Sequence, residues 1–227
     1  MNAKTAYPRV FLIDVDNTLL DNDQIEQDVS DHLTAVFGRE ACDRYWSILE
    51  QLRDELGYAD FLGALQRYRV EHLHDPHILE MSTFLVDYPF ADRLFPKALE
   101  LVTHVSTKWP VVIFSDGDAV FQPRKVERSG LWKAVDGRVL IYPHKEQMLD
   151  DVDRLYPAKH YVFVDDKLRL LTAVKKGWGG RVTTIFARQG HYANDPSIKA
   201  FPPADLTIAR IGDLFEYVAR LESVDHQ

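Results

Sequence analysis

Cysteine is nearly absent from this sequence of 227 residues, which contains a single one, Cys42. One cysteine cannot form a disulfide within the chain and has no partner for a cysteine-based zinc site. Because disulfides are typical of oxidising compartments, the composition indicates a reducing one. The N-terminus, MNAKTAYPRVFLIDV, also lacks the long apolar region of a secretory signal peptide. We therefore expect a cytoplasmic protein.

Long apolar runs and excess positive charge are missing as well. No apolar run approaches the roughly 18 residues that span a bilayer, so we expect no membrane partner. The formal net charge is -8 and the pI is about 5.6. A chain with this charge repels a nucleic-acid backbone, so we expect no nucleic-acid partner. The sequence leaves the oligomeric state open.

What the sequence does contain is a series of short apolar runs, each long enough for one buried strand. They lie at residues 10–15, 111–114, 161–164 and 182–187. Runs that are apolar on both faces are typical of a parallel sheet. Helical apolar spacing follows at 98–105, 148–155 and 170–174. This alternation of strands and helices predicts an α/β fold with a Rossmann-like parallel sheet as its core.

Residues 22–90 do not follow this alternation. Apolar positions within 25–37, 41–56 and 61–68 have helical spacing, and Asp75-Pro76 suggests the N-cap and first turn of a fourth helix. We predict an all-helical insertion at 22–90 and an α/β core made of 1–21 and 91–227. The insertion holds 14 acidic residues, five arginines and no lysine, a net charge of -9 that leaves +1 for the core.

Acidic residues follow three of the predicted strands. The residues concerned are Asp14 and Asp16 after the first strand, Ser115, Asp116 and Gly117 after the second, and Asp165 and Asp166 after the third. In an open parallel sheet, ligands bind at the carboxyl ends of the strands, so these side chains should meet at one edge. Carboxylates that close repel one another unless a cation lies among them. Oxygen ligands without His or Cys favour magnesium over zinc.

A magnesium site beside a pair of carboxylates indicates chemistry on a phosphoryl group. A carboxylate that the metal keeps ionised, such as Asp14, can be a nucleophile. Asp16, two residues later, can protonate a leaving oxygen and afterwards take a proton from water. Ser115 offers a hydroxyl to a phosphate oxygen.

The phosphoryl charge also calls for a lysine. We favour Lys145, expected at the start of the helix at 148–155, where unpaired N–H groups would also stabilise a phosphate. Lys125 and Lys167 are the alternatives.

These segments resemble the four motifs of the haloacid dehalogenase (HAD) superfamily, whose members are mostly magnesium-dependent phosphatases. DVDNTLLD at 14–21 resembles the first motif, VVIFSDG at 111–117 the second, Lys145 the third and VFVDDK at 162–167 the fourth. The resemblance extends from Val10 to about Phe186. It implies that the insertion is a helical cap, which closes over the site and selects substrates.

The resemblance also implies roles for single residues. Asp14 would form an aspartyl-phosphate, Asp16 would be the acid/base, and Thr18 would set the loop after the strand. The backbone carbonyl of Asp16 would ligate magnesium together with Asp14. The second motif, with Ser115, Asp116 and Gly117, would bind the phosphate.

The fourth motif departs from the pattern of many members. They carry a further acid four residues after their aspartate, where this chain has Leu170, and the chain offers the adjacent pair Asp165-Asp166 instead. We expect Asp166 to reach the metal and Asp165 to orient a water or Lys145. Either one remains possible as the direct ligand.

The expected function is therefore magnesium-dependent hydrolysis of a small soluble phosphomonoester through an aspartyl-phosphate. Dehalogenases of the superfamily lack an acid two residues after the nucleophile, and its phosphonate-cleaving members use a cap lysine, which 22–90 does not contain. A phosphomutase remains the main alternative, and a non-catalytic phosphate-binding protein a further one. Partners for a substrate carboxylate or second phosphate could come from the cap arginines 39, 44, 53, 67 and 69.

Overall fold

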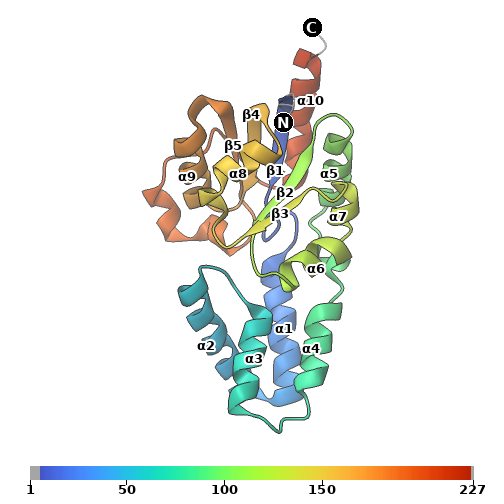
Figure 1. The fold of residues 1–227 in the computed structure, drawn as a ribbon, viewed down its shortest axis with the longest axis vertical. Coiled ribbons are helices and arrows are strands. Elements are labelled where there is room, and N and C mark those ends of the chain that lie inside the picture. Colours follow the sequence, from blue (N-terminus) through green and yellow to red (C-terminus); the bar gives the residue numbers. More distant parts are fainter. Residues whose placement is uncertain (1–5, 226–227) are drawn as a thin grey trace.

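A six-stranded sheet forms the centre of the computed structural model, which describes residues 6–225 (Figure 1). Its strands are β1 (Tyr7–Ile13), β2 (Val111–Asp116), β3 (Val139–Tyr142), β4 (Ala158–Asp165), β5 (Val182–Ala187) and β6 (Leu206–Ile208). All neighbouring strands are parallel, in the order β3-β2-β1-β4-β5-β6. The predicted α/β class with a Rossmann-like sheet is confirmed.

The sequence predicts the four central strands and misses the two at the edges. In β1, Phe11 pairs with Val111 of β2 and Val162 of β4, and all three side chains are fully buried. Strand β3 is half-buried along its length, and β6 has three residues, two of them exposed. An edge strand needs no continuous apolar run, because one side of it faces away from the core.

Helices cover both faces of the sheet. On one face lie α5 (Ala98–Ser106), α7 (Leu131–Ala134) and α10 (Leu214–Asp225), and on the other α8 (Leu149–Leu155) and α9 (Leu168–Trp178). Short 3-10 helices are η1 (Phe90–Arg93), η2 (Lys145–Gln147), η3 (Gly179–Arg181), η4 (His191–Asn194), η5 (Pro196–Ala200) and η6 (Ile211–Asp213). Within residues 6–225, no helix is both long and apolar enough to cross a membrane.

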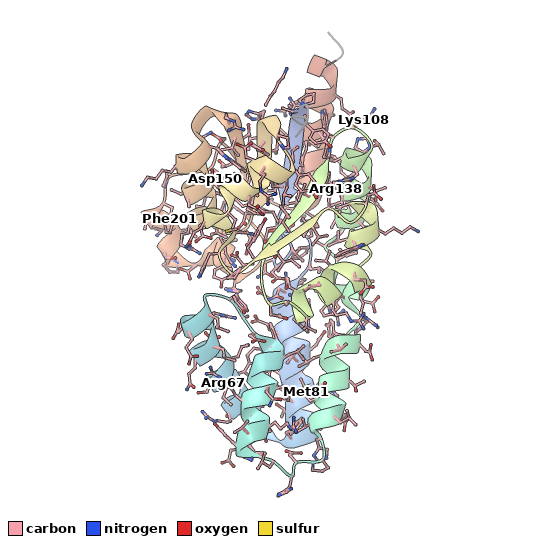
Figure 2. The ribbon with its side chains drawn as sticks, in the orientation of Figure 1. Arg67, Met81, Lys108, Arg138, Asp150 and Phe201 are labelled. Atoms are coloured by element: carbon pink, nitrogen blue, oxygen red, sulfur yellow. The ribbon has the colours of Figure 1, made fainter. Side chains whose placement is uncertain are left out.

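The helical insertion lies at the carboxyl ends of the strands (Figure 1). It consists of α1 (Asn22–Phe37), α2 (Arg39–Leu56), α3 (Phe61–Glu71) and α4 (Ile78–Asp87). Asp21 caps α1 by accepting a hydrogen bond from Gln24 N, and Asp60 caps α3. Figure 2 labels Met81 of α4, which is fully buried among apolar side chains of the other three helices. The insertion thus has an apolar cluster of its own.

The predicted start of the fourth helix is wrong by two residues. Helix α4 begins at Ile78, and Asp75 Oδ1 accepts a hydrogen bond from His77 N at 2.9 Å. Asp side chains bond readily to a backbone N–H two residues later, which closes a turn instead of capping a helix. Asp75 and Pro76 therefore lie in the loop before α4.

Helix α6 (Phe121–Arg128), which follows β2, packs against both the core and the insertion. Its Val126 belongs to the apolar cluster between the sheet and helices α5, α7 and α10. At its other end Phe121 stacks on Phe61 of α3, with ring centroids 4.7 Å apart, and also contacts Phe90. The position of α6 is therefore fixed by both apolar clusters.

Candidate active site

Asp14 follows β1 directly and is almost completely buried, with 5% of its surface exposed. Thr18 Oγ1 donates a hydrogen bond to Asp14 Oδ2 at 3.2 Å. Between them Asn17 adopts a left-handed conformation, with φ of 57°, which asparagine tolerates better than most residues. Its side-chain oxygen accepts hydrogen bonds from the N–H groups of Asn22 and Asp23. The loop after β1 is thus bonded to the start of α1.

Lys145 lies beside Asp14, as the sequence predicts. Its ammonium is 2.5 Å from Asp14 Oδ1 and 2.7 Å from Asp165 Oδ2, and it donates to the carbonyl of Phe114 at 3.0 Å. Burial opposes the charge, but the surrounding carboxylates outweigh it and raise the pKa of Lys145 above its usual value. Lys145 is therefore a fully buried cation at the ends of three strands.

The predicted place of Lys145 at the start of a helix is wrong. It opens the 3-10 turn η2, and α8 begins four residues later at Leu149. The N–H of Lys145 donates to Asp116 Oδ1 at 2.7 Å, so a carboxylate already occupies this N–H group. The helix N-terminus that was expected to face a phosphate is not at this position.

The second predicted motif supplies a buried hydroxyl and a carboxylate. Ser115 is 1% exposed, and its Oγ accepts a hydrogen bond from Gln122 Nε2 at 2.9 Å. Asp116 accepts the hydrogen bond from the N–H of Lys145 and so fixes the turn η2. Burial raises the pKa of the Asp116 carboxyl group. At Gly117 a Cβ atom would meet the Gln122 side chain at 2.7 Å. A residue with a side chain at 117 would therefore disturb the contact between Gln122 and Ser115.

Asp165 and Asp166 follow β4 and are both fully buried. Asp165 Oδ2 forms an ion pair with the Lys145 ammonium, and its Oδ1 accepts a hydrogen bond from the N–H of Lys167. Asp166 has no hydrogen-bond partner at either carboxylate oxygen. Burial raises the pKa of Asp166 well above its usual value, although Lys167 opposes the shift. Asp166 is thus a buried acid whose charge is not compensated by hydrogen bonds within the described chain.

Three of the predicted metal ligands come together. Asp14, Asp165 and Asp166 each offer a carboxylate oxygen, and these atoms lie within 4.8 Å of one another. A set of hard oxygen donors with two orphaned oxygens on Asp166 fits a divalent cation such as magnesium. The carboxylate of Asp16 does not belong to this group.

The protonation of Asp14 is balanced between two opposing effects. Burial raises its pKa to about 6, and the Lys145 ammonium counteracts part of that rise. The neighbouring Asp165 carboxylate adds to it. Additional positive charge at the three acids would favour the ionised form of Asp14.

Asp16 is held by two side chains of α6. Lys125 Nζ lies 2.6 Å from Asp16 Oδ1, and Gln122 Nε2 donates to Oδ2 at 3.3 Å. Lys125 is 1% exposed and donates a second hydrogen bond to Asn22 Oδ1 at 2.9 Å. Asp16 itself is partly exposed, with 27% of its side chain accessible.

The three candidate lysines thus occupy different positions. Lys145 contacts Asp14, and Lys125 contacts Asp16. The Lys167 ammonium lies over the ring of Tyr192, 4.7 Å from the centroid, and Asp166 raises its pKa against the effect of burial. In the sequence the three lysines were alternatives for one role, whereas in the fold Lys145 and Lys125 contact different carboxylates.

A cavity of about 380 Å³ opens between these carboxylates and the insertion. Asp16, Asp116, Gly117 and Asp166 line it from the core. The insertion contributes Glu26, Arg53, Tyr58 and Phe61, and the segment after β5 contributes His191, Tyr192, Ile198 and Phe201. Phe201 lies on the α9 side of the core (Figure 2). The space is large enough for a small organic molecule.

The insertion touches the core next to the candidate lysine. Gly57, in the turn between α2 and α3, has φ of 84° and lines the cavity. A Cβ atom added there would lie 2.0 Å from Cε1 of His144, the residue before Lys145. This close approach brings the turn between α2 and α3 against the residue that precedes Lys145.

Two residues that line the cavity, Gln122 and His191, and the nearby Gln189 lie outside the four motifs. Gln122 sits on α6, and its place in the site depends on how that helix packs. Gln189 and His191 follow β5, and Gln189 Nε2 donates to the carbonyl of Thr18 at 2.9 Å. Gln189 and His191 both follow the predicted strand at 182–187. The rule that ligands bind at the carboxyl ends of parallel strands would therefore have indicated them as well.

Comparisons with known proteins agree with this architecture. A family model for haloacid dehalogenase-like hydrolases matches residues 8–176. The solved structure of a Burkholderia xenovorans LB400 protein, assigned to the haloacid dehalogenase-like hydrolases, is 61% identical, with a TM-score of 0.87; the match covers 92% of this chain and 97% of that one. No curated protein matches the chain.

More distant structures share the fold. YfnB from Bacillus subtilis, assigned to the HAD hydrolases and bound to magnesium, has a TM-score of 0.65 at 15% identity, covering 95% of this chain and all of that one (100%). L-2-haloacid dehalogenase from Xanthobacter autotrophicus has a TM-score of 0.61 at 16% identity, covering 94% and 98%. At these identities the likeness concerns the fold alone.

Proposed function

The chain belongs to the haloacid dehalogenase-like hydrolases, and from this premise we propose that it hydrolyses a small phosphomonoester with magnesium through an aspartyl-phosphate on Asp14. The helical insertion acts as a cap that roofs the cavity. The alcohol part of the ester lies between the cap and the segment after β5.

Asp14 is the proposed nucleophile. It stands at the end of the central strand β1, with one oxygen beside the Lys145 ammonium and the other accepting from Thr18. Lys145 offsets negative charge on Asp14 and on the incoming phosphate. The Ser115 hydroxyl, which donates to the carbonyl of Asp116 at 3.3 Å in the structure, is the proposed donor to a phosphate oxygen.

Asp14, Asp165 and Asp166 are the residues that would hold magnesium, and the unpartnered oxygens of Asp166 support this assignment. When bound, the ion supplies positive charge that compensates the three carboxylates and a phosphate. Asp165 also keeps Lys145 in place.

The observation that carries the proposal is the position of Asp16. Asp16 stands two residues after Asp14 in the sequence and lines the cavity. Its carboxyl group contacts Lys125 and Gln122. A dehalogenation needs no acid at this place, because a halide leaves without a proton. Cleavage of an alkyl phosphate does need one, since an alkoxide is a poor leaving group.

The proposed reaction has two steps. Asp14 Oδ attacks phosphorus, the bond from phosphorus to the ester oxygen breaks, and protonated Asp16 gives its proton to that oxygen. Water then attacks phosphorus of the aspartyl-phosphate while the Asp16 carboxylate takes a proton from it. Phosphate leaves, and both aspartates return to their starting forms.

The proposed function is tested with a panel of phosphomonoesters, with and without magnesium, beside 2-haloacids. The panel includes sugar phosphates, nucleoside monophosphates and phosphoglycolate. We expect release of phosphate from at least one ester, only with the metal. Halide release without any phosphate release would overturn the proposal. Transfer of phosphate to a second hydroxyl instead of water would identify a mutase.

Magnesium should stabilise the folded protein through Asp166. At a concentration about 100 times its dissociation constant, a ligand adds roughly 2.7 kcal/mol, which corresponds to an increase of roughly 5–10 °C in Tm for a chain of this size. In Asp166→Asn this increase should disappear, and without metal the variant should be at least as stable as wild type, because an uncompensated buried charge is removed. Scanning calorimetry and binding calorimetry measure both effects.

Asp43→Asn is the matched control for this measurement, since Asp43 is exposed on α2. It should keep the full response to magnesium. An equal increase of Tm in Asp166→Asn would remove Asp166 from the metal site.

Arg53 should recognise a second anionic group on the ester. It lines the cavity, 3.7 Å from Glu26 and 3.2 Å from Glu50, whereas Arg44 pairs with Glu71 on the exposed surface. Arg53→Met should lower kcat/KM about 10- to 100-fold for esters with a carboxylate or second phosphate, the value of a hydrogen bond to a charged group.

Arg44→Met is the control for Arg53, and esters of uncharged alcohols are the control among substrates. Both should change less than threefold. An equal decrease in kcat/KM for all esters in Arg53→Met would show that Arg53 does not recognise the second anionic group.

A further inference from the structure

The two α6 side chains on Asp16 belong to none of the four motifs. Lys125 is a fully buried cation, and Gln122 is 3% exposed. They stand three residues apart on α6, which places them on one helix face. Each donates to a different oxygen of Asp16, at 2.6 Å and 3.3 Å. Two hydrogen bonds to separate oxygens fix both the direction and the rotation of a carboxylate.

Both donors are themselves held. Lys125 donates to Asn22 Oδ1 at 2.9 Å, and Gln122 donates to Ser115 Oγ at 2.9 Å. Phe121 at the start of α6 stacks on Phe61 of α3, so the helix cannot shift without disturbing the insertion. The ammonium of Lys125 is therefore kept between Asp16 and the first residue of α1.

Both α6 side chains meet Asp16 as hydrogen-bond donors. An ammonium and an amide N–H are donors only, and a carboxylate has about four lone-pair sites, so it can accept both bonds and still accept one from water. In the proposed function, the carboxylate of Asp16 is the form present after the leaving group has departed. It is also the form that must then take a proton from water.

We propose that Lys125 and Gln122 are positioning residues for the second half of the reaction, in which Asp16 activates the water that hydrolyses the aspartyl-phosphate. This inference rests on the proposed function of Asp14 and Asp16. It assigns α6 the task of holding Asp16 in place as the base of that second step.

The test uses p-nitrophenyl phosphate, whose leaving group departs without a proton. Formation of the aspartyl-phosphate, which sets kcat/KM, should then not depend on Asp16. In Lys125→Met we expect kcat to fall about 100-fold, in line with general-base catalysis, and kcat/KM to stay within about threefold of wild type. Rapid mixing should show a burst of about one nitrophenol per protein molecule, as the phosphoenzyme accumulates.

Further variants separate positioning from a loss of structure. In Gln122→Leu, kcat should also fall, by a smaller factor than in Lys125→Met, and kcat/KM should again stay close to that of wild type. Adding Lys125→Met to Asp16→Asn should cost less than twofold beyond Asp16→Asn alone, because both act through one group. Arg124→Met, which removes an exposed partner of Glu127 on the same helix, should behave as wild type.

Three results would overturn the assignment. A parallel fall of kcat and kcat/KM in Lys125→Met and Gln122→Leu would indicate a general structural defect. Unchanged kcat in both, or additive losses in the double variant, would show that they do not act through Asp16. Failure of the wild type to release phosphate from p-nitrophenyl phosphate and from every ester of the panel would refute the proposed function itself, and this role of α6 with it.

Discussion

Asp14→Asn is expected to abolish turnover, with a fall in kcat of at least about 10⁴-fold, as when the nucleophile of a covalent mechanism is removed. The amide is nearly the same size as the carboxyl group and can still accept a hydrogen bond from Thr18. No phosphoryl group should be trapped on the protein after acid quenching, whereas wild type should yield a phosphoenzyme that hydroxylamine cleaves.

This loss of activity should come without a loss of stability. Burial raises the pKa of Asp14 to about 6, so at pH 7 the folded metal-free protein carries a charge that costs free energy. Asparagine removes that cost, and Lys145 keeps its contact with Asp165. The Tm of Asp14→Asn at pH 7 without metal should therefore equal or exceed that of wild type.

Asp136→Asn provides the control for Asp14→Asn. The Asp136 side chain is 91% exposed, and its backbone has φ of 55°, which asparagine adopts readily. Its activity and Tm should not change. Turnover by Asp14→Asn within tenfold of wild type would rule out a covalent intermediate on this residue.

Lys145→Met should lose both activity and stability. Breaking a buried ion pair by removing one partner costs about 3–5 kcal/mol, because the remaining charge stays buried and uncompensated. Here two carboxylates, those of Asp14 and Asp165, lose the same cation. Urea denaturation should show a decrease of this size in the free energy of unfolding. We also expect kcat to fall about 10³-fold, as on loss of an oxyanion-stabilising donor.

A second substitution can separate these two effects. Adding Asp165→Asn to Lys145→Met removes one of the uncompensated charges and should recover part of the stability, but none of the activity. Lys159→Met, at an exposed position of β4, is the control and should match wild type in both measurements. A Lys145→Met variant as stable as wild type would contradict the importance of this buried ion pair.

The sequence predicts the central strands because a few consecutive residues are enough to identify each of them. Val10 to Ile13, and the matching runs in β2 and β4, are apolar on both faces, and only a strand buried on both sides requires this. The acids after these strands then meet at one edge by topology alone. The proximity of Asp14 and Asp165 could therefore be foreseen although 150 residues separate them in the chain.

What the sequence does not predict depends on packing at longer range. In the sequence, Lys125 is one of several charged residues of an amphipathic helix. It reaches Asp16 only because α6 packs between two apolar clusters. The turn before α8 could not be foreseen either, since Asp116 must bond to the N–H of Lys145 to form it. The five arginines of the insertion were equivalent in sequence, and the helix arrangement places Arg53 at the cavity.

The contact between Gly57 and His144 restricts how this chain can diverge. A left-handed backbone already disfavours other residues at position 57, and any Cβ there would collide with the imidazole. Relatives that replace this glycine need a smaller residue at 144 or a wider space between the insertion and the core. Across a set of homologues, positions 57 and 144 should therefore covary.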